Sequence, residues 1–167
     1  MCIVQILMIF IFYEAIKTDR ENYLKYASES HEILEFLLNG NFYYLLINEP
    51  IWLLVNILMS NIFDIQYVPL VIGLISYLLS VNYVLKKVDK RYLLFIILLF
   101  FMPQIYKSFL VHLRQGLAIA VYLSSFLVEK RRNKYSLIMF SGLIHNSFIP
   151  ILLVHIIYEY FLKKYSA

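Results

Sequence analysis

Two ionisable residues, Arg114 and His145, lie inside stretches of the sequence that are otherwise apolar. Arg114 stands in His-Leu-Arg-Gln-Gly-Leu-Ala at 112–118, and His145 stands in Ile-His-Asn-Ser at 144–147. A charged arginine near the centre of a membrane helix costs about 2.5–3.5 kcal/mol, so Arg114 needs an anionic partner, a wet cavity or an interfacial position. A guanidinium can bind an anion through two parallel hydrogen bonds, and a neutral imidazole can accept a proton. Both residues are therefore candidates for a functional site.

A second group of candidates is acidic and lies in a polar stretch near the N-terminus. Asp19 and Glu49 could each act as a general base or bind a substrate hydroxyl, because a carboxylate at a membrane surface can activate an alcohol. The structural alternatives are a helix cap for Asp19 and a partner of the helix dipole for Glu49, and each is commoner than catalysis for an isolated acid.

The composition indicates that the elements holding these residues are membrane helices. The chain is 62% hydrophobic, its mean hydropathy is +0.72, and its apolar residues form long blocks. The net charge of +4 does not indicate a nucleic-acid partner, because the basic residues concentrate in short linkers as membrane orientation signals do. The single cysteine, Cys2, excludes an internal disulfide and a cysteine-based metal cluster. We find no metal-binding or nucleotide-loop motif and expect no metal and no cofactor.

The expected fold class is all-α, a polytopic membrane helix bundle. We expect about five spanning helices, and two surface-lying amphipathic helices after the first of them. The expected spans are 2–15, 67–85, 92–110, 114–128 and 135–158. Apolar residues at three- and four-residue spacing predict the first amphipathic helix over 19–39, and Glu49-Pro50 opens a second that ends before Asp64. We expect a single integral membrane domain over 1–167.

The charges of the linkers predict how this bundle sits in the membrane. The linkers 86–91 and 129–134 each hold four basic residues and one acidic residue, and both should face the cytoplasm. If the helix at 50–63 spans, the acidic segment shares that side. If it only lies on the membrane, as we prefer because it is short, residues 17–66 form an external acidic loop. Arg114 then lies on the same face as this loop.

The positions of the candidates along their helices allow one common site. At 1.5 Å per residue, Arg114 lies about 21 Å and His145 about 15 Å above the inner ends of their helices. Gly116, with Ala118 and Ala120, predicts close packing of the arginine-bearing helix against a neighbour.

Several short motifs occur in the order seen in one family of membrane proteins. They are Asp19-(x)3-Tyr23, Glu49-Pro50, the run from Leu113 to Ala118, the basic linker that follows, and Ile144-His145-Asn146-Ser147. With them the chain resembles the N-terminal half of the EpsG-type polysaccharide polymerases, which are related to O-antigen polymerases and similar to GT-C glycosyltransferases. Members of that family continue through several more spans, so we expect this chain to be incomplete at its C-terminus.

The resemblance implies a function, a substrate and a location. The function is polymerisation of lipid-linked oligosaccharide repeat units in exopolysaccharide, capsule or O-antigen biosynthesis. The substrate is an oligosaccharide carried on a polyprenyl diphosphate, and other polysaccharide assembly proteins are further expected partners. The protein would be a multi-pass protein of the bacterial cytoplasmic (inner) membrane and, if complete, a glycosyltransferase.

The resemblance also assigns roles to the candidate residues. The expected catalytic residues are Asp19, Glu49 and His145, and the expected substrate-binding residues are Arg114, Gln115 and Tyr23. Arg114 would bind the diphosphate and stabilise the charge that develops on it. The alternative is a non-catalytic membrane protein, such as a truncated remnant, a small transporter-like protein or an assembly subunit. In that case Arg114 and His145 only pair between helices.

Overall fold

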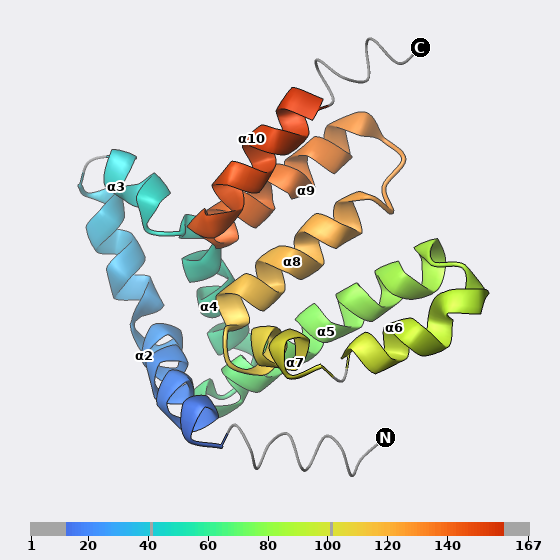
Figure 1. Cartoon of the computed structure of the whole chain (residues 1–167). Coiled ribbons are helices and arrows are strands. Elements are labelled where there is room, and N and C mark those ends of the chain that lie inside the picture. The colour runs from blue at the N-terminus through green and yellow to red at the C-terminus, as the bar shows by residue number, and fades with distance from the viewer. Residues whose placement is uncertain (1–12, 41, 101, 159–167) are drawn as a thin grey trace.

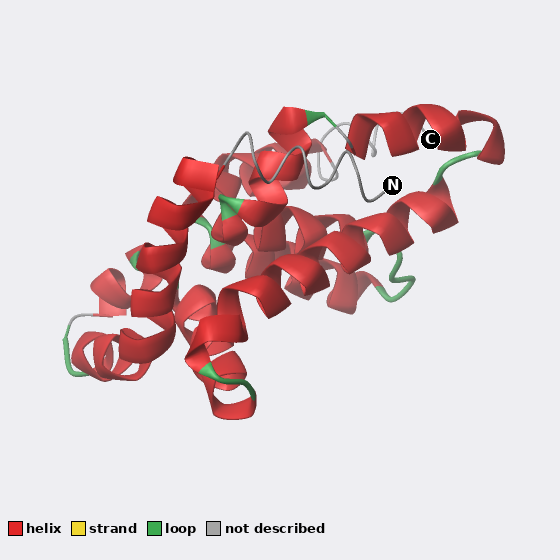
Figure 2. Ribbon diagram, turned by 90° about the horizontal axis from the view of Figure 1, so that it is seen from below, coloured by secondary structure: helices red, strands yellow, loops and turns green. Residues whose placement is uncertain are grey.

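The computed structural model describes residues 13–40, 42–100 and 102–158, and within these ranges the chain forms helices and no strand (Figures 1 and 2). The longer helices are α2 (Tyr13–Leu38), α4 (Pro50–Ile62), α5 (Val68–Lys87), α8 (Leu113–Ser125) and α9 (Arg131–Ile144). The shorter ones are α3 (Phe42–Ile47), η1 (Ile65–Tyr67), η2 (Lys90–Tyr92), α6 (Leu93–Phe100), α7 (Pro103–Leu110), η3 (Asn146–Phe148) and α10 (Ile149–Ile157). The predicted all-α fold class is confirmed.

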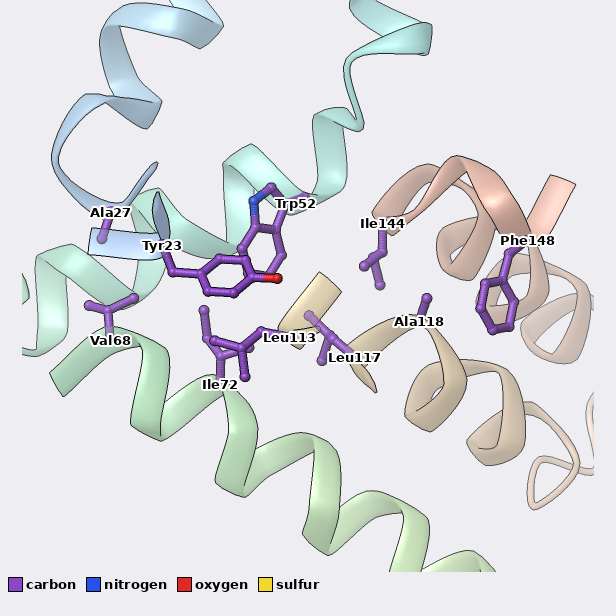
Figure 3. Close-up of a cluster of buried hydrophobic side chains, with 10 residues drawn as sticks. All are labelled: Tyr23, Ala27, Trp52, Val68, Ile72, Leu113, Leu117, Ala118, Ile144 and Phe148. Atoms are coloured by element: carbon purple, nitrogen blue, oxygen red, sulfur yellow. The ribbon is translucent and has the colours of Figure 1, made fainter. Parts of the chain in front are cut away.

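Helix α8 lies between α5 and α9 and packs on both, while α2 packs along α4 (Figure 1). These helices meet in one buried apolar cluster, whose side chains Figure 3 shows pointing toward one another. Its members are Tyr23, Ala27, Trp52, Val68, Ile72, Leu113, Leu117, Ala118, Ile144 and Phe148. These side chains come from the five long helices and, for Phe148, from η3, and their burial fixes how α2 and α4 stand relative to α8.

The two helices predicted in the polar N-terminal region are present. The predicted helix at 19–39 is part of α2, which buries Tyr23, Ala27, Ser30 and Leu37 at three-, four- and seven-residue spacing. This spacing places the buried residues on one face, as an amphipathic helix requires. Helix α4 begins with Pro50 in its first turn, as predicted, because proline has no N–H to lose there.

Two of the predicted spans are interrupted. The span expected over 92–110 is wrong as one helix, because α6 ends at Phe100 and α7 begins at Pro103. The span expected over 135–158 is broken at His145, whose backbone is extended (φ −150°, ψ 118°). The two prolines act differently at these breaks. Met102, directly before Pro103, is extended (φ −64°, ψ 133°), as a residue before proline prefers. Ile149, directly before Pro150, is helical, but Pro150 lacks the N–H that a continuous helix would donate to the carbonyl oxygen of Asn146.

One helix in the described part of the chain, over Ile65–Lys87, is long and apolar enough to cross a membrane, with a hydropathy of 2.0. The apolar helices Pro50–Ile62 and Asn146–Ile157 are shorter, and α8 has only 13 residues, which is shorter than the predicted 114–128. The prediction of five spans is therefore not confirmed. Most of the span expected over 2–15 lies outside the described residues.

Close packing of α8 is confirmed. A Cβ atom on Gly116 would collide with the carbonyl oxygen of Ser108 at the end of α7, so only glycine allows this approach. Ala118 and Ala120 are completely buried. The contact holds the N-terminal turn of α8, which carries Arg114, against α7.

Candidate functional site

Glu49 occupies an unusual backbone position directly before α4. It is the one non-glycine residue with a positive φ in the described part of the chain, at φ 54° and ψ 60°. A residue with a side chain in this left-handed region costs about 1–3 kcal/mol unless its surroundings hold it there. The carboxylate of Glu49 supplies such interactions, because it is bonded to two other segments of the chain.

Both carboxylate oxygens of Glu49 are engaged. Arg114 Nη1, in the first turn of α8, donates to Oε2 at 2.7 Å. His145 Nδ1 lies 2.6 Å from Oε1, and the backbone N–H of Asn146 donates to the same oxygen at 3.2 Å. The side-chain amide of Asn146 donates to the carbonyl oxygen of Ile47, just before Glu49. The break between α9 and α10 is therefore tied to the turn before α4.

The environment of Glu49 keeps its carboxylate ionised. Burial by itself raises the pKa of Glu49. The hydrogen bond from His145 and the charge of Arg114 together lower this pKa by more than burial raises it, so the resulting pKa lies below the ordinary value for glutamate. An ionised carboxylate can only accept hydrogen bonds. His145 Nδ1 must therefore carry the hydrogen, and in the neutral form of the ring Nε2 is then the acceptor.

Arg114 is held by an aromatic face as well as by Glu49. Its guanidinium lies 5.4 Å from the ring centroid of Tyr26, a cation–π distance, and its side chain is 34% exposed against 10% for Glu49. The guanidinium thus stays accessible while its counter-ion is covered. An accessible guanidinium with a fixed position can bind a further anion.

A hollow of about 140 Å³, which we call the site hollow, collects most of the predicted site residues. It is lined by Tyr23, His112, Arg114, Gln115 and His145. Three of these residues come from the α7–α8 junction, one from α2 and one from the break after α9. Arg114 and His145 line the same hollow, as their positions along the sequence allowed. They are joined through Glu49, to which each of them bonds.

Asp19 has a different partner. Its Oδ2 lies 3.7 Å from Nδ1 of His112, a residue that lines the site hollow. Asp19 therefore reaches the hollow through His112, outside the set of bonds made by Glu49. In the described part of the chain no group of three or more His, Cys, Asp or Glu residues could hold a metal ion.

Sequence reasoning did not identify Tyr26, His112 or Asn146 as site residues. Tyr26 follows Tyr23 by three residues, which places both on neighbouring positions of one helix face and could have signalled it. Asn146 belongs to the motif Ile144-His145-Asn146-Ser147. His112 has no ligand spacing to other histidines, and only the fold brings it to Asp19.

The chain matches no curated protein and no solved structure. The model of the EpsG family matches residues 1–167, which is the whole sequence given. The family match agrees with the resemblance carried by the motifs around Glu49, Arg114 and His145, which the fold brings to one place. The family is membrane-associated and has a general role in polysaccharide biosynthesis. The chain therefore belongs to the EpsG family.

Proposed function

We propose that the protein lengthens polysaccharide chains by transferring a glycan from a polyprenyl diphosphate to a hydroxyl group of another repeat unit, in exopolysaccharide, capsule or O-antigen biosynthesis. The acceptor oxygen forms a bond to the anomeric carbon of the donor glycan. The bond from that carbon to the diphosphate breaks, and the diphosphate leaves with the electron pair. The proton of the acceptor hydroxyl passes to a base.

Arg114 binds the departing diphosphate in this proposal. Its bond to Glu49 is made by Nη1, and a guanidinium has five N–H donors in a planar fork. Further donors can therefore face the site hollow, where charge-assisted bonds to phosphate oxygens stabilise the charge that develops during transfer. Tyr23 and Gln115 line the same hollow and are the further candidates for substrate binding.

His145 is the proposed base, and Glu49 is a positioning residue. The 2.6 Å contact between His145 Nδ1 and Glu49 is the observation that carries the proposal, because it leaves Nε2 as a proton acceptor in a ring of fixed orientation. The Glu49 carboxylate is a weaker base than an ordinary glutamate, since both its oxygens are bonded and its pKa is lowered. Asp19 orients His112 at the edge of the hollow and is a second positioning candidate.

The proposed setting is the bacterial cytoplasmic membrane. There the donor lipid and the bilayer are the partners, and other polysaccharide assembly proteins are further candidates. The multi-pass arrangement with an external site remains part of this proposal. The long apolar helix Ile65–Lys87 supports attachment to the bilayer.

The length distribution of lipid-linked glycan tests this function. Arg114→Ala, in a full-length background that complements a deletion strain, should shorten the ladder to single repeat units, because the leaving diphosphate loses its cation. Arg132→Ala is the matched control, since Arg132 is exposed in the first turn of α9 and does not line the site hollow. A ladder of unchanged length for Arg114→Ala, at an unchanged amount of folded protein, would remove Arg114 from the reaction.

A second candidate function is a non-catalytic assembly subunit, and one observation favours it. Arg114, His145 and Glu49 already satisfy one another, as structural ion pairs between helices do. Under this candidate, Arg114→Ala lowers the amount of folded protein, and the polymer made per folded molecule stays the same. Quantifying both in one experiment separates the two functions.

A further inference from the structure

Two larger hollows adjoin the site hollow, and their linings differ in polarity. One, which we call the apolar hollow, has a volume of about 280 Å³ and is lined mainly by apolar groups, among them Tyr23, Pro69, Leu70, Leu110 and Leu113. The other, which we call the polar groove, has a volume of about 420 Å³. Its lining is mainly polar and includes Asn22, Lys25, Tyr26, Glu29 and Arg114.

Shared residues connect the three hollows in a fixed order. Tyr23 lines both the apolar hollow and the site hollow, and Arg114 lines both the site hollow and the polar groove. A molecule lying through them would meet an apolar wall first, then a guanidinium with two imidazoles, and then a groove of amide, hydroxyl and charged groups. This order matches an amphiphile with a hydrocarbon end, an anionic middle and a polar end.

The apolar hollow also lies where a membrane lipid can reach it. Pro69, Leu70 and Gly73 belong to the first turns of α5, and α5 forms most of the helix that is long enough to cross a membrane. Leu70 is 65% exposed, so this wall of the hollow is open to the surroundings of α5. A hydrocarbon chain lying beside α5 gains by covering this apolar surface without leaving the bilayer.

We propose that the apolar hollow binds the first isoprenoid units of the lipid carrier, so that the diphosphate meets Arg114 and the glycan extends into the polar groove. This assignment rests on the proposed function and adds to it the direction in which the donor lies. It makes Leu70 and its neighbours determinants of carrier recognition, separate from the residues that bind the diphosphate.

The test compares two probes on the purified full chain in detergent: farnesyl diphosphate, which has an isoprenoid tail, and inorganic pyrophosphate, which has none. Leu70→Trp places a larger side chain at the apolar hollow and should weaken binding of farnesyl diphosphate at least tenfold. Binding of pyrophosphate should stay unchanged. Leu74→Trp is the matched control, since Leu74 lies one turn further along α5, is 55% exposed and does not line the hollow.

A second variant, Leu70→Asp, changes polarity without adding bulk and should weaken farnesyl diphosphate in the same selective way. The assignment is overturned if the folded Leu70 variants bind farnesyl diphosphate as tightly as Leu74→Trp does. It is equally overturned if they weaken both probes by the same factor. Failure of the proposed function has a different signature, because Arg114→Ala would then leave the binding of pyrophosphate unchanged.

Discussion

One carboxylate, that of Glu49, connects three segments that are far apart in the sequence. Arg114 is 65 residues away and His145 is 96 residues away, yet both side chains bond to it. Hydrogen bonds to charged groups contribute about 1.5–3 kcal/mol each, and removing one partner leaves the others without compensation for their lost hydration. The residue that positions the site therefore also stabilises the fold.

Glu49→Gln should lower the free energy of unfolding by about 1.5–3 kcal/mol, because glutamine keeps the shape of the side chain and removes the charge that Arg114 requires. Denaturant unfolding of the full chain in detergent measures this difference. Glu35→Gln, at an exposed position of α2, should change the same free energy by less than about 0.5 kcal/mol. Equal effects of the two substitutions would contradict a stabilising role for Glu49.

The stabilisation by Glu49 should depend on pH in a defined direction. The pKa of Glu49 is lowered in the folded protein, so its contribution is fully present above the ordinary glutamate pKa and is lost as the pH falls through the lowered value. The stability difference between wild type and Glu49→Gln should therefore be constant near neutral pH and shrink in acid. Unfolding curves for both proteins over this range would show it. A difference that grows in acid would exclude the lowered pKa.

His145→Ala should slow chain elongation by about 10²–10⁴-fold, which is the usual loss when a general base is removed. Glu49→Gln should also slow it, because the neutral amide no longer holds the His145 ring as a charged acceptor does. His31→Ala, at an exposed position of α2, is the control for removal of an imidazole. Elongation rates from radiolabelled lipid-linked repeat units measure all three, and a rate for His145→Ala equal to that of His31→Ala would exclude the base role.

At the scale of the elements, the start of α8 is the part on which the site depends most. Arg114 stands in the first turn of this helix, where the positive end of the helix dipole disfavours a cation by about 0.3–1 kcal/mol. The carboxylate of Glu49 offsets this cost from outside the helix. Gly116 allows α8 to approach α7 closely, and this approach fixes the position of Arg114 in the lining of the site hollow.

Gly116→Ala should destabilise the protein by about 1–3 kcal/mol and reduce elongation, because the added Cβ must push α8 away from Ser108 and carries Arg114 with it. Thermal unfolding and elongation rate measure the two effects. Gly40→Ala is the matched control, since its nearest neighbours would lie at 3.5 and 3.6 Å, an ordinary contact distance. Unchanged stability for Gly116→Ala would show that α7 and α8 can separate without cost.

At the scale of the whole molecule, the charges of the linkers predict the side of the membrane on which the site lies. A reporter inserted after Gly40 should signal from outside the cytoplasm, and one inserted after Lys130 should signal from inside, because the basic linker around Lys130 orients the chain. Paired fusions to alkaline phosphatase and green fluorescent protein at each position measure this. A cytoplasmic signal at Gly40 would contradict an external site.

The helical fold class, the helix at Pro50, the close packing at Gly116 and the family were predictable from the sequence, because each follows from local pattern or motif. The sequence did not predict the breaks at Met102 and His145, where Pro103 and Pro150 outweigh the apolar residues on either side. The bonds of Glu49 with both Arg114 and His145, and the pairing of Asp19 with His112, depend on how the helices pack. The packing of α2, α4, α8 and α9 determines which of these residues come into contact. The bonded residues are 65 and 96 positions apart, and a pairing over such distances produces no periodic pattern in the sequence.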